Sequence, residues 1–305
     1  MNSSWVRVGI AGALSALAMF AAQPGSLAGL LFGFMASLPL FLVGFSGGRF
    51  QGVAAAGSAL VAIVFAAGAI PAIYYAVVNA LPACLIIWLM PIARERLGFL
   101  ISALALYGSL VICLAAVAFM GEPGGLQAVL REATLEMLQQ IGPVSPTGTP
   151  INGIEQLAEI VALVFPASAA TGSLLLLMGN AVLGQALVKR FATPVYASPD
   201  LAEMRVSKWA PHLLAMTIAG GFLPGNIGYL ASNISVLAAI PFLFAGLAVI
   251  HSLLRRTTWT VPGLTLIYLL VLLFMWPALI VIFVGLMDLV FDFRRGGGQP
   301  SPPDD

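Results

Sequence analysis

Residues 160–188 read IVALVFPASAATGSLLLLMGNAVLGQALV, a run that contains no acidic or basic side chain. A transmembrane α-helix needs about 20 consecutive, predominantly apolar residues. The run is long enough to cross a bilayer as a helix, and the charged pair Lys189 and Arg190 ends it. It therefore predicts that the chain is a helical membrane protein.

The composition of the whole chain indicates the same class. Of 305 residues, 60% are hydrophobic and 8% are charged, whereas a soluble domain has about 25% charged and about 45–50% apolar residues. A water-soluble fold is excluded, and the first expected partner is the lipid bilayer. The formal net charge is +1 and the 13 Lys and Arg residues are scattered. No nucleic-acid partner is expected, because nucleic-acid binding needs a basic surface.

Apolar runs bounded by charged residues or by Gly and Pro recur along the sequence. The eight runs that predict spans are Val8–Ala22, Leu27–Phe45, Val53–Ala69, Ala72–Met90, Phe99–Met120, Ile160–Val188, Ala210–Leu223 and Tyr229–Leu254. A ninth run, Val261–Phe291, has Trp276 and Pro277 at its middle and forms either one overlong helix or a hairpin. The expected fold is an all-α polytopic membrane protein with about eight transmembrane helices and a C-terminal hydrophobic hairpin.

The positions of Lys and Arg predict the orientation, because cytoplasmic loops carry an excess of both. With the N-terminus inside, ten of the 13 cations lie on the cytoplasmic side and only Arg131 lies outside. A hairpin at 261–291 brings Arg294 and Arg295 inside as well, so the count favours the hairpin. The count predicts a multi-pass membrane protein with both termini cytoplasmic.

The domain organisation is predicted to be simple. Residues 1–292 form a single integral membrane domain with one outer insertion, residues 121–153. Within the insertion, residues 125–141 have apolar side chains at helical spacing, which predicts an amphipathic helix on the outer membrane surface. Residues 293–305 are rich in Gly and Pro and are predicted to be a disordered cytoplasmic tail.

Three amides within the predicted spans are candidate ligand-binding residues: Asn79, Asn180 and Asn233. Asn79 precedes Pro82, and Asn233 follows the sequence GNIG at 225–228, so both lie where helices are expected to break. Amides and freed backbone groups at such breaks bind small molecules in protein-lined cavities, or simply satisfy one another. Both interpretations are open at the level of sequence.

His251 and Asp288 are ionisable groups inside apolar runs, where such groups usually pair or mark a pathway. In the hairpin topology both lie at the inner face. The carboxylate then either orients the imidazole or neutralises Arg255 or Arg256. We therefore expect an ion pair that anchors the last helices or, alternatively, a proton-coupling or ligand-binding role.

Small residues four apart occupy the first span, as the pairs Gly9 with Ala13 and Gly12 with Ala16. Such faces let helix backbones approach closely in lipid. The pairs predict either packing within the chain or a docking face for a separate membrane subunit.

One hydrolase motif is present, since residues 44–48 read GFSGG and place Ser46 in the pattern G-x-S-x-G. Ser46 with His251 would form an intramembrane serine hydrolase dyad, but the motif requires a strand-to-helix turn that an all-helical protein lacks. Cys84 and Cys113 lie inside apolar runs and behave as small hydrophobes. No metal-binding or nucleotide-binding motif is found, so we expect no enzymatic activity, no cofactor and no metal.

The C-terminal third carries a family resemblance in the segments GLAVIH at 246–251, Arg255-Arg256, GLMD at 285–288 and DFR at 292–294. With these residues the chain resembles the YybS-like family of bacterial polytopic membrane proteins, which is distantly similar to the S components of energy-coupling-factor vitamin transporters. The resemblance implies that the chain lies in a bacterial inner membrane and binds a small molecule. It also implies a membrane coupling subunit that contacts the small residues of the first helix, Gly9, Gly12, Ala13 and Ala16. The chain differs from S components in having more than six predicted spans and a long outer insertion. The alternative is a scaffolding membrane protein that recruits partner helices.

Overall fold

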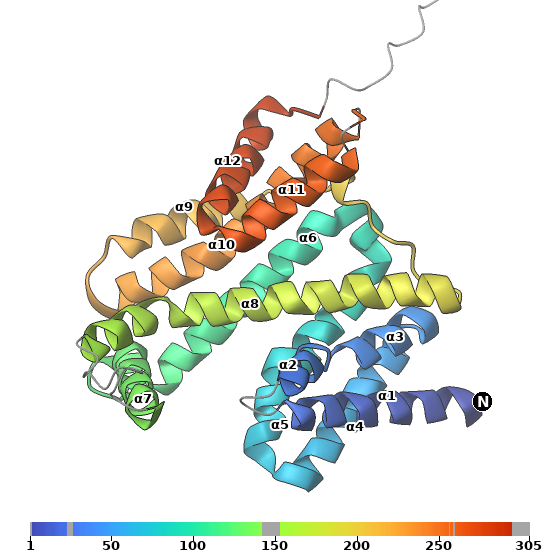
Figure 1. The fold of residues 1–305 in the computed structure, drawn as a ribbon, viewed down its shortest axis with the longest axis horizontal. Helices are drawn as coiled ribbons and strands as arrows, with labels where there is room; N and C mark the ends of the chain where they lie inside the picture. Colours follow the sequence, from blue (N-terminus) through green and yellow to red (C-terminus); the bar gives the residue numbers. More distant parts are fainter. Residues whose placement is uncertain (1, 23–26, 142–152, 256, 259, 295–305) are drawn as a thin grey trace, which may run out of the picture.

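The computed structural model describes residues 2–22, 27–141, 153–255, 257–258 and 260–294. Within these ranges the chain is helical and contains no β-strand (Figure 1). The α-helices are α1 Asn2–Ala21, α2 Leu27–Phe34, α3 Leu38–Gly47, α4 Arg49–Ala67, α5 Ala69–Tyr75, α6 Leu81–Ala118, α7 Gly125–Ile141, α8 Ile154–Phe191, α9 Ala210–Gly221, α10 Gly225–Leu254, α11 Thr260–Leu273 and α12 Met275–Phe291. A π-helical turn, η1 Ala76–Ala80, joins α5 to α6, and a 3-10 turn, η2 Leu201–Glu203, precedes α9. The predicted all-α fold is confirmed.

Five helical segments in the described ranges are long and apolar enough to cross a membrane: Ser4–Ala21, Arg49–Ala67, Ala69–Ala118, Ile154–Phe191 and Gly225–Leu254. The bent pair α11 and α12 brings the number to six if it forms one span. Large apolar side chains cover the outer surface, for example Phe65 at 87% and Phe222 at 86% exposure. The protein is therefore a multi-pass membrane protein, but the expected count of eight spans is not confirmed.

Two of the expected spans are shorter than the sequence suggested. The run Leu27–Phe45 is divided, because α2 ends at Phe34 and α3 begins at Leu38 with Pro39 in its first turn. A proline fits the first turn of a helix, where its missing N–H costs no hydrogen bond. Helix α9 has 12 residues and rises about 18 Å, well short of a hydrocarbon core of about 30 Å.

Two other expected spans lie in one helical run, Ala69–Ala118. This run contains a break at Arg96, whose φ of −132° and ψ of 44° are not helical. Gly98 follows the break and permits close contact with the loop between α8 and α9, since a Cβ on Gly98 would lie 1.8 Å from the carbonyl oxygen of Arg205. The break coincides with the short basic segment that the sequence placed between two spans.

Helix α8 lies at the centre of the molecule and contacts α3, α6, α7 and α10. In Figure 1 it separates α1 to α5 on one side from α9 to α12 on the other. The helix predicted over residues 125–141 is present as α7, and the apolar run 160–188 lies within α8. The largest buried side chains of the core include Phe41, Phe45 and Leu237.

The C-terminal run bends by 116° at Phe274, two residues before the expected turn at Trp276 and Pro277. Phe274 has extended backbone angles, and Pro277 lies in the first turn of α12. Helix α12 then crosses α10 at two glycines: a Cβ on Gly246 would lie 1.9 Å from the Val281 carbonyl oxygen, and one on Gly285 would lie 2.0 Å from that of Phe242. Only glycine permits this backbone contact. The predicted disorder of residues 295–305 lies outside the described residues.

Candidate functional site

A cavity of about 470 Å³ opens between α1, the turn from α2 to α3, the π-helical turn η1 and α8. Its walls contain no acidic or basic side chain within the described part of the chain. The lining residues are Met19, Ala22, Gly33, Phe34, Ala36, Ser37, Tyr74, Val78, Asn79, Ser173, Leu176, Leu177 and Asn180. Two of the three predicted amides, Asn79 and Asn180, therefore face one cavity.

Asn79 projects from the π-helical turn η1. Pro82 accounts for the irregular turn, because it has no N–H to donate to the carbonyl of Val78 four residues earlier. The hydroxyl of Tyr107 donates to the neighbouring carbonyl of Val77 at 2.6 Å. Asn79 Oδ1 accepts a hydrogen bond from Ser37 Oγ at 2.9 Å, and no hydrogen bond from its Nδ2 to another described residue is found. Such single π-turns are frequent at functional sites.

Asn180 approaches the same cavity from α8 and is buried. Its Nδ2 donates to the carbonyl oxygen of Phe34 at 2.5 Å. Phe34 ends α2, so its carbonyl has no partner within that helix. No hydrogen bond to Asn180 Oδ1 is found among the described residues, and Asn180 lines the cavity. The cavity wall thus presents one open amide donor, on Asn79, and one open amide acceptor, on Asn180.

A buried hydrogen-bond group holds the wall in place. Ser15 Oγ of α1 donates to the Ala36 carbonyl oxygen at 2.5 Å and is also hydrogen-bonded to the hydroxyl of Tyr75. Ser15 and Tyr75 are both fully buried. Sequence reasoning missed Ser15, Ser37 and the Phe34 carbonyl, because a lone serine or a helix end carries no pattern that reveals its partner.

Asn233 lies elsewhere, beside Pro166, which removes one hydrogen bond from within α8. Its Oδ1 accepts from the Ala167 N–H at 3.0 Å, and its Nδ2 donates to the carbonyl oxygens of Leu163 at 3.2 Å and Tyr229 at 2.9 Å. The Ala167 N–H and the Leu163 carbonyl would bond to each other in a regular helix, so the amide is inserted between them. Asn233 is not brought together with Asn79 and Asn180.

The hydroxyl of Tyr229 completes the repair of α8 by donating to the carbonyl oxygen of Ala162 at 2.8 Å. That carbonyl lies four residues before Pro166, which cannot donate to it. The second of the two interpretations for breaks, satisfaction of freed groups, therefore describes Asn233.

The expected pair of His251 and Asp288 is not formed. Asp288 is hydrogen-bonded through Oδ2 to Arg294 Nη2 in an ion pair whose side chains are 5% and 10% exposed. His251 Nδ1 donates to the Leu247 carbonyl oxygen of its own helix at 3.0 Å, and its ring packs edge-on against Tyr268. Asp288 takes Arg294 as its partner because the chain reverses after Asp292, whose φ is 44°. The spacing of six residues across a helix end was the available signal.

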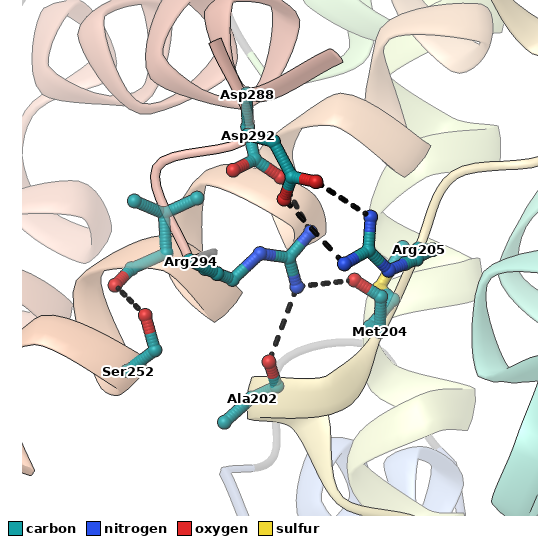
Figure 2. A network of polar contacts seen from close by, with 8 residues as sticks. Ala202, Met204, Arg205, Ser252, Asp288, Asp292 and Arg294 are labelled. Atoms are coloured by element: carbon teal, nitrogen blue, oxygen red, sulfur yellow. Dashed lines mark hydrogen bonds and ion pairs between the residues drawn. The ribbon is translucent and has the colours of Figure 1, made fainter. Parts of the chain in front are cut away.

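Figure 2 shows how Arg294 ties the end of α12 to the loop that contains η2. Arg294 Nη1 donates to the carbonyl oxygens of Ala202 at 3.1 Å and Met204 at 2.5 Å. Asp288 Oδ1 and Arg294 Nε are buried and have no partner in the described ranges. The sequence placed Arg294 in the tail, whereas it is part of the folded domain.

The same loop also binds the end of α10. Arg255 donates to both carboxylate oxygens of Asp200, at 2.8 and 3.0 Å. These hydrogen bonds from Arg255 hold the pKa of Asp200 below its ordinary value, and partial burial opposes the shift. Arg255 and Arg294 therefore meet one loop, which places the ends of α10 and α12 at the same end of the molecule.

The small-residue pairs of α1 divide between two faces. Gly12 and Ala16 are buried against α4, and a Cβ on Gly12 would lie 1.9 Å from Ser58 Oγ. Gly9 and Ala13 are exposed, and a Cβ on Gly9 would meet nothing within 4 Å. Packing within the chain thus accounts for one pair only.

The residues of the hydrolase motif are not joined to a base. Ser46 Oγ donates to the Leu42 carbonyl oxygen of its own helix at 2.6 Å, and His251 is bonded to Leu247. The described residues contain no group of three His, Cys, Asp or Glu side chains that could hold a metal ion. Cys84 and Cys113 are free cysteines.

A protein family described as "Predicted membrane protein (DUF2232)" has a model that matches residues 13–289. The chain belongs to this family. The matched range contains Asn79, Asn180 and Asn233, and it excludes Gly9. No curated protein and no solved structure matches the chain.

Proposed function

We propose that this protein is a transporter-like, non-enzymatic membrane protein that binds a small molecule in the cavity between Asn79 and Asn180. The observation that carries the proposal is the pair of open amide groups, a donor on Asn79 and an acceptor on Asn180, in one uncharged cavity. A volume of about 470 Å³ lies within the range of small-molecule sites, about 300–1,000 Å³.

The cavity is built where helices are interrupted, as in transporters whose broken helices place polar groups inside the membrane. Asn180 ties α8 to the end of α2, and Asn79 ties the π-helical turn to Ser37 at the start of α3. A ligand that hydrogen-bonds to both amides would contact both of these joints. Binding would thereby favour one arrangement of these four segments.

The proposal also includes a partner subunit and an orientation in the membrane. Its resemblance to the YybS-like family and to S components supports a separate coupling subunit, with Gly9 and Ala13 on the docking face. The gathering of Arg94, Lys189, Arg255 and Arg294 around the loop 192–209 supports a cytoplasmic location for this end of the molecule. A cytoplasmic location of this end accords with cytoplasmic termini in a bacterial inner membrane. It also accords with the helical run Ala69–Ala118 crossing the membrane twice, once before and once after the break at Arg96.

The test is ligand-dependent thermal stabilisation of the purified protein in lipid nanodiscs, with a panel of vitamins and small metabolites. We expect at least one compound to raise Tm in the wild type, and Asn79→Ala and Asn180→Ala to lose that shift. Ser235→Ala is the matched control, because Ser235 bonds only within α10. The absence of any shift across the panel, or an equal shift in all variants, would overturn the proposal.

A scaffolding role is the second candidate, and the exposed Gly9 and Ala13 favour it. A scaffold should crosslink to a constant membrane partner without any ligand. The double variant Gly9→Leu with Ala13→Leu should abolish that crosslink, whereas Val61→Leu on the exposed face of α4 should not. Crosslinking that is unchanged in the double variant would contradict this role.

A further inference from the structure

A second cavity, of about 440 Å³, lies beside the first between η1, α6, α7 and α8. The two cavities share Tyr74, Val78 and Ser173 in their walls, so they adjoin. Leu126 and Leu130 of the amphipathic helix α7 close the far side of the second cavity. The two cavities are therefore neighbours with a common wall.

The chemistry differs between the two cavities. The first cavity contains the open amide groups of Asn79 and Asn180, whereas the second is lined almost entirely by apolar side chains. The hydroxyl of Tyr107, which also lines the second cavity, is already bonded to the Val77 carbonyl oxygen. Neither cavity has an acidic or basic side chain in its wall among the described residues.

These walls select for a particular class of ligand. Burying a charged group without a partner costs much more free energy than burying a polar group that is hydrogen-bonded. A phosphate or carboxylate headgroup would find no cation in the walls. A hydroxyl or amide group, in contrast, can both donate to Asn180 Oδ1 and accept from Asn79 Nδ2.

We propose that the ligand is an uncharged, single-chain amphiphile. Its hydroxyl or amide head bonds to Asn79 and Asn180, and its alkyl chain lies in the second cavity against α6, α7 and α8. This inference rests on the proposed function and names the substrate class of the same site.

The part of α8 around Pro166 forms part of the wall of the second cavity. Phe165 and Pro166 line the second cavity, and Asn233 holds the backbone on both sides of that proline. Asn233 is therefore a positioning residue for the wall of the chain-binding cavity and does not contact the ligand.

The test uses a monoacylglycerol that carries a photoactivatable diazirine at the end of its chain, added to the protein in nanodiscs. We expect crosslinks on α6, α7 and α8 at the second cavity. Ala169→Trp should fill this cavity and reduce the crosslink yield about tenfold, in line with the cost of overpacking. Ser168→Trp is the matched control, because Ser168 and Ala169 are adjacent and both exposed, but only Ala169 lines the cavity.

The outcomes separate this inference from the proposed function. If the probe does not label the second cavity while a small compound still stabilises the wild type through Asn79 and Asn180, the amphiphile inference is wrong and the proposed function stands. If the wild type shows neither labelling nor stabilisation, both are wrong. Equal labelling by the corresponding fatty acid, whose headgroup is charged, would also overturn the inference, as would equal losses in Ala169→Trp and Ser168→Trp.

Discussion

The amides of Asn79 and Asn180 contrast with the amide of Asn233. All three lie in apolar surroundings near an interrupted helix, yet both polar side-chain atoms of Asn233 are hydrogen-bonded to the backbone of α8. Asn79 and Asn180 each use one atom and leave the other open in a cavity. The difference indicates that a buried amide is structural when it completes a broken helix and available for binding when it does not.

The ion pair of Asp288 and Arg294 extends this contrast to charged groups, because it too is committed to the fold. Arg294→Ala should have the largest effect, a loss of about 3–5 kcal/mol in the free energy of unfolding, since Asp288 would remain buried without its partner. Denaturant unfolding in micelles measures it. Arg205→Ala is the control, because the Arg205 side chain is 68% exposed in its pair with Asp292. Equal losses in the two variants would show that burial of the pair does not matter.

Asn233→Leu should have the next largest effect. It removes the hydrogen bonds to Ala167 and Leu163, and each unsatisfied buried group costs about 1–3 kcal/mol. The same unfolding experiment should show a clear loss of stability relative to Ser235→Ala. A variant as stable as that control would break the contrast, because Asn233 would then no longer be needed by α8.

Asn79→Ala should change stability less than Asn233→Leu does. It removes one hydrogen bond, from Ser37, which contributes about 0.5–1.5 kcal/mol, and water can enter the cavity to replace it. Ligand-induced stabilisation, in contrast, should be lost. A loss of stability as large as that of Asn233→Leu would place Asn79 among the structural amides.

The smallest expected effect is the pH dependence of the exposed pair formed by Asp200 and Arg255. The pKa of Asp200 is lowered by its hydrogen bonds to Arg255, so the pair stabilises the fold fully above the unfolded pKa of about 3.9. The contribution is lost as the pH falls from there through the lowered folded pKa.

Solvent screening limits the contribution of this pair to about 0–1 kcal/mol. The measurement compares the acid unfolding of the wild type and Arg255→Gln between pH 5 and pH 2, a window chosen to bracket the ordinary Asp pKa of about 3.9. We expect the wild type to lose slightly more stability across this window. Identical pH profiles would show that the pair contributes nothing.

The long apolar elements were predictable from the sequence, and the short ones were not. Helix α7 follows from helical spacing, and the part of α8 at residues 160–188 follows from the absence of charged residues there. The run at residues 27–45 looked like one span because hydropathy does not register a turn at residues 35–37. The basic segment around Arg96 indicated a boundary between two spans. The sequence did not show that the helical run continues on both sides of it.

The sequence identified the candidate residues of the site, but only the fold showed which of them lie together. All three amides, Asn79, Asn180 and Asn233, were selected as polar side chains within predicted spans, where a polar group is costly to bury. The sequence offered His251, Arg255 and Arg256 as partners of Asp288, whereas the ion pair forms with Arg294, because the turn after Asp292 returns that residue to the carboxylate.

By itself, the sequence determined that the chain is a helical membrane protein, because the free energy of transferring apolar residues into lipid depends on composition and on the length of each run. The tertiary structure alone decided which polar atoms are satisfied. The partners of Asn180 and Asn233 lie far from them along the chain, at Phe34 and Leu163. A hydrogen bond depends on the distance and angle between two atoms, and only the packing of the helices sets these.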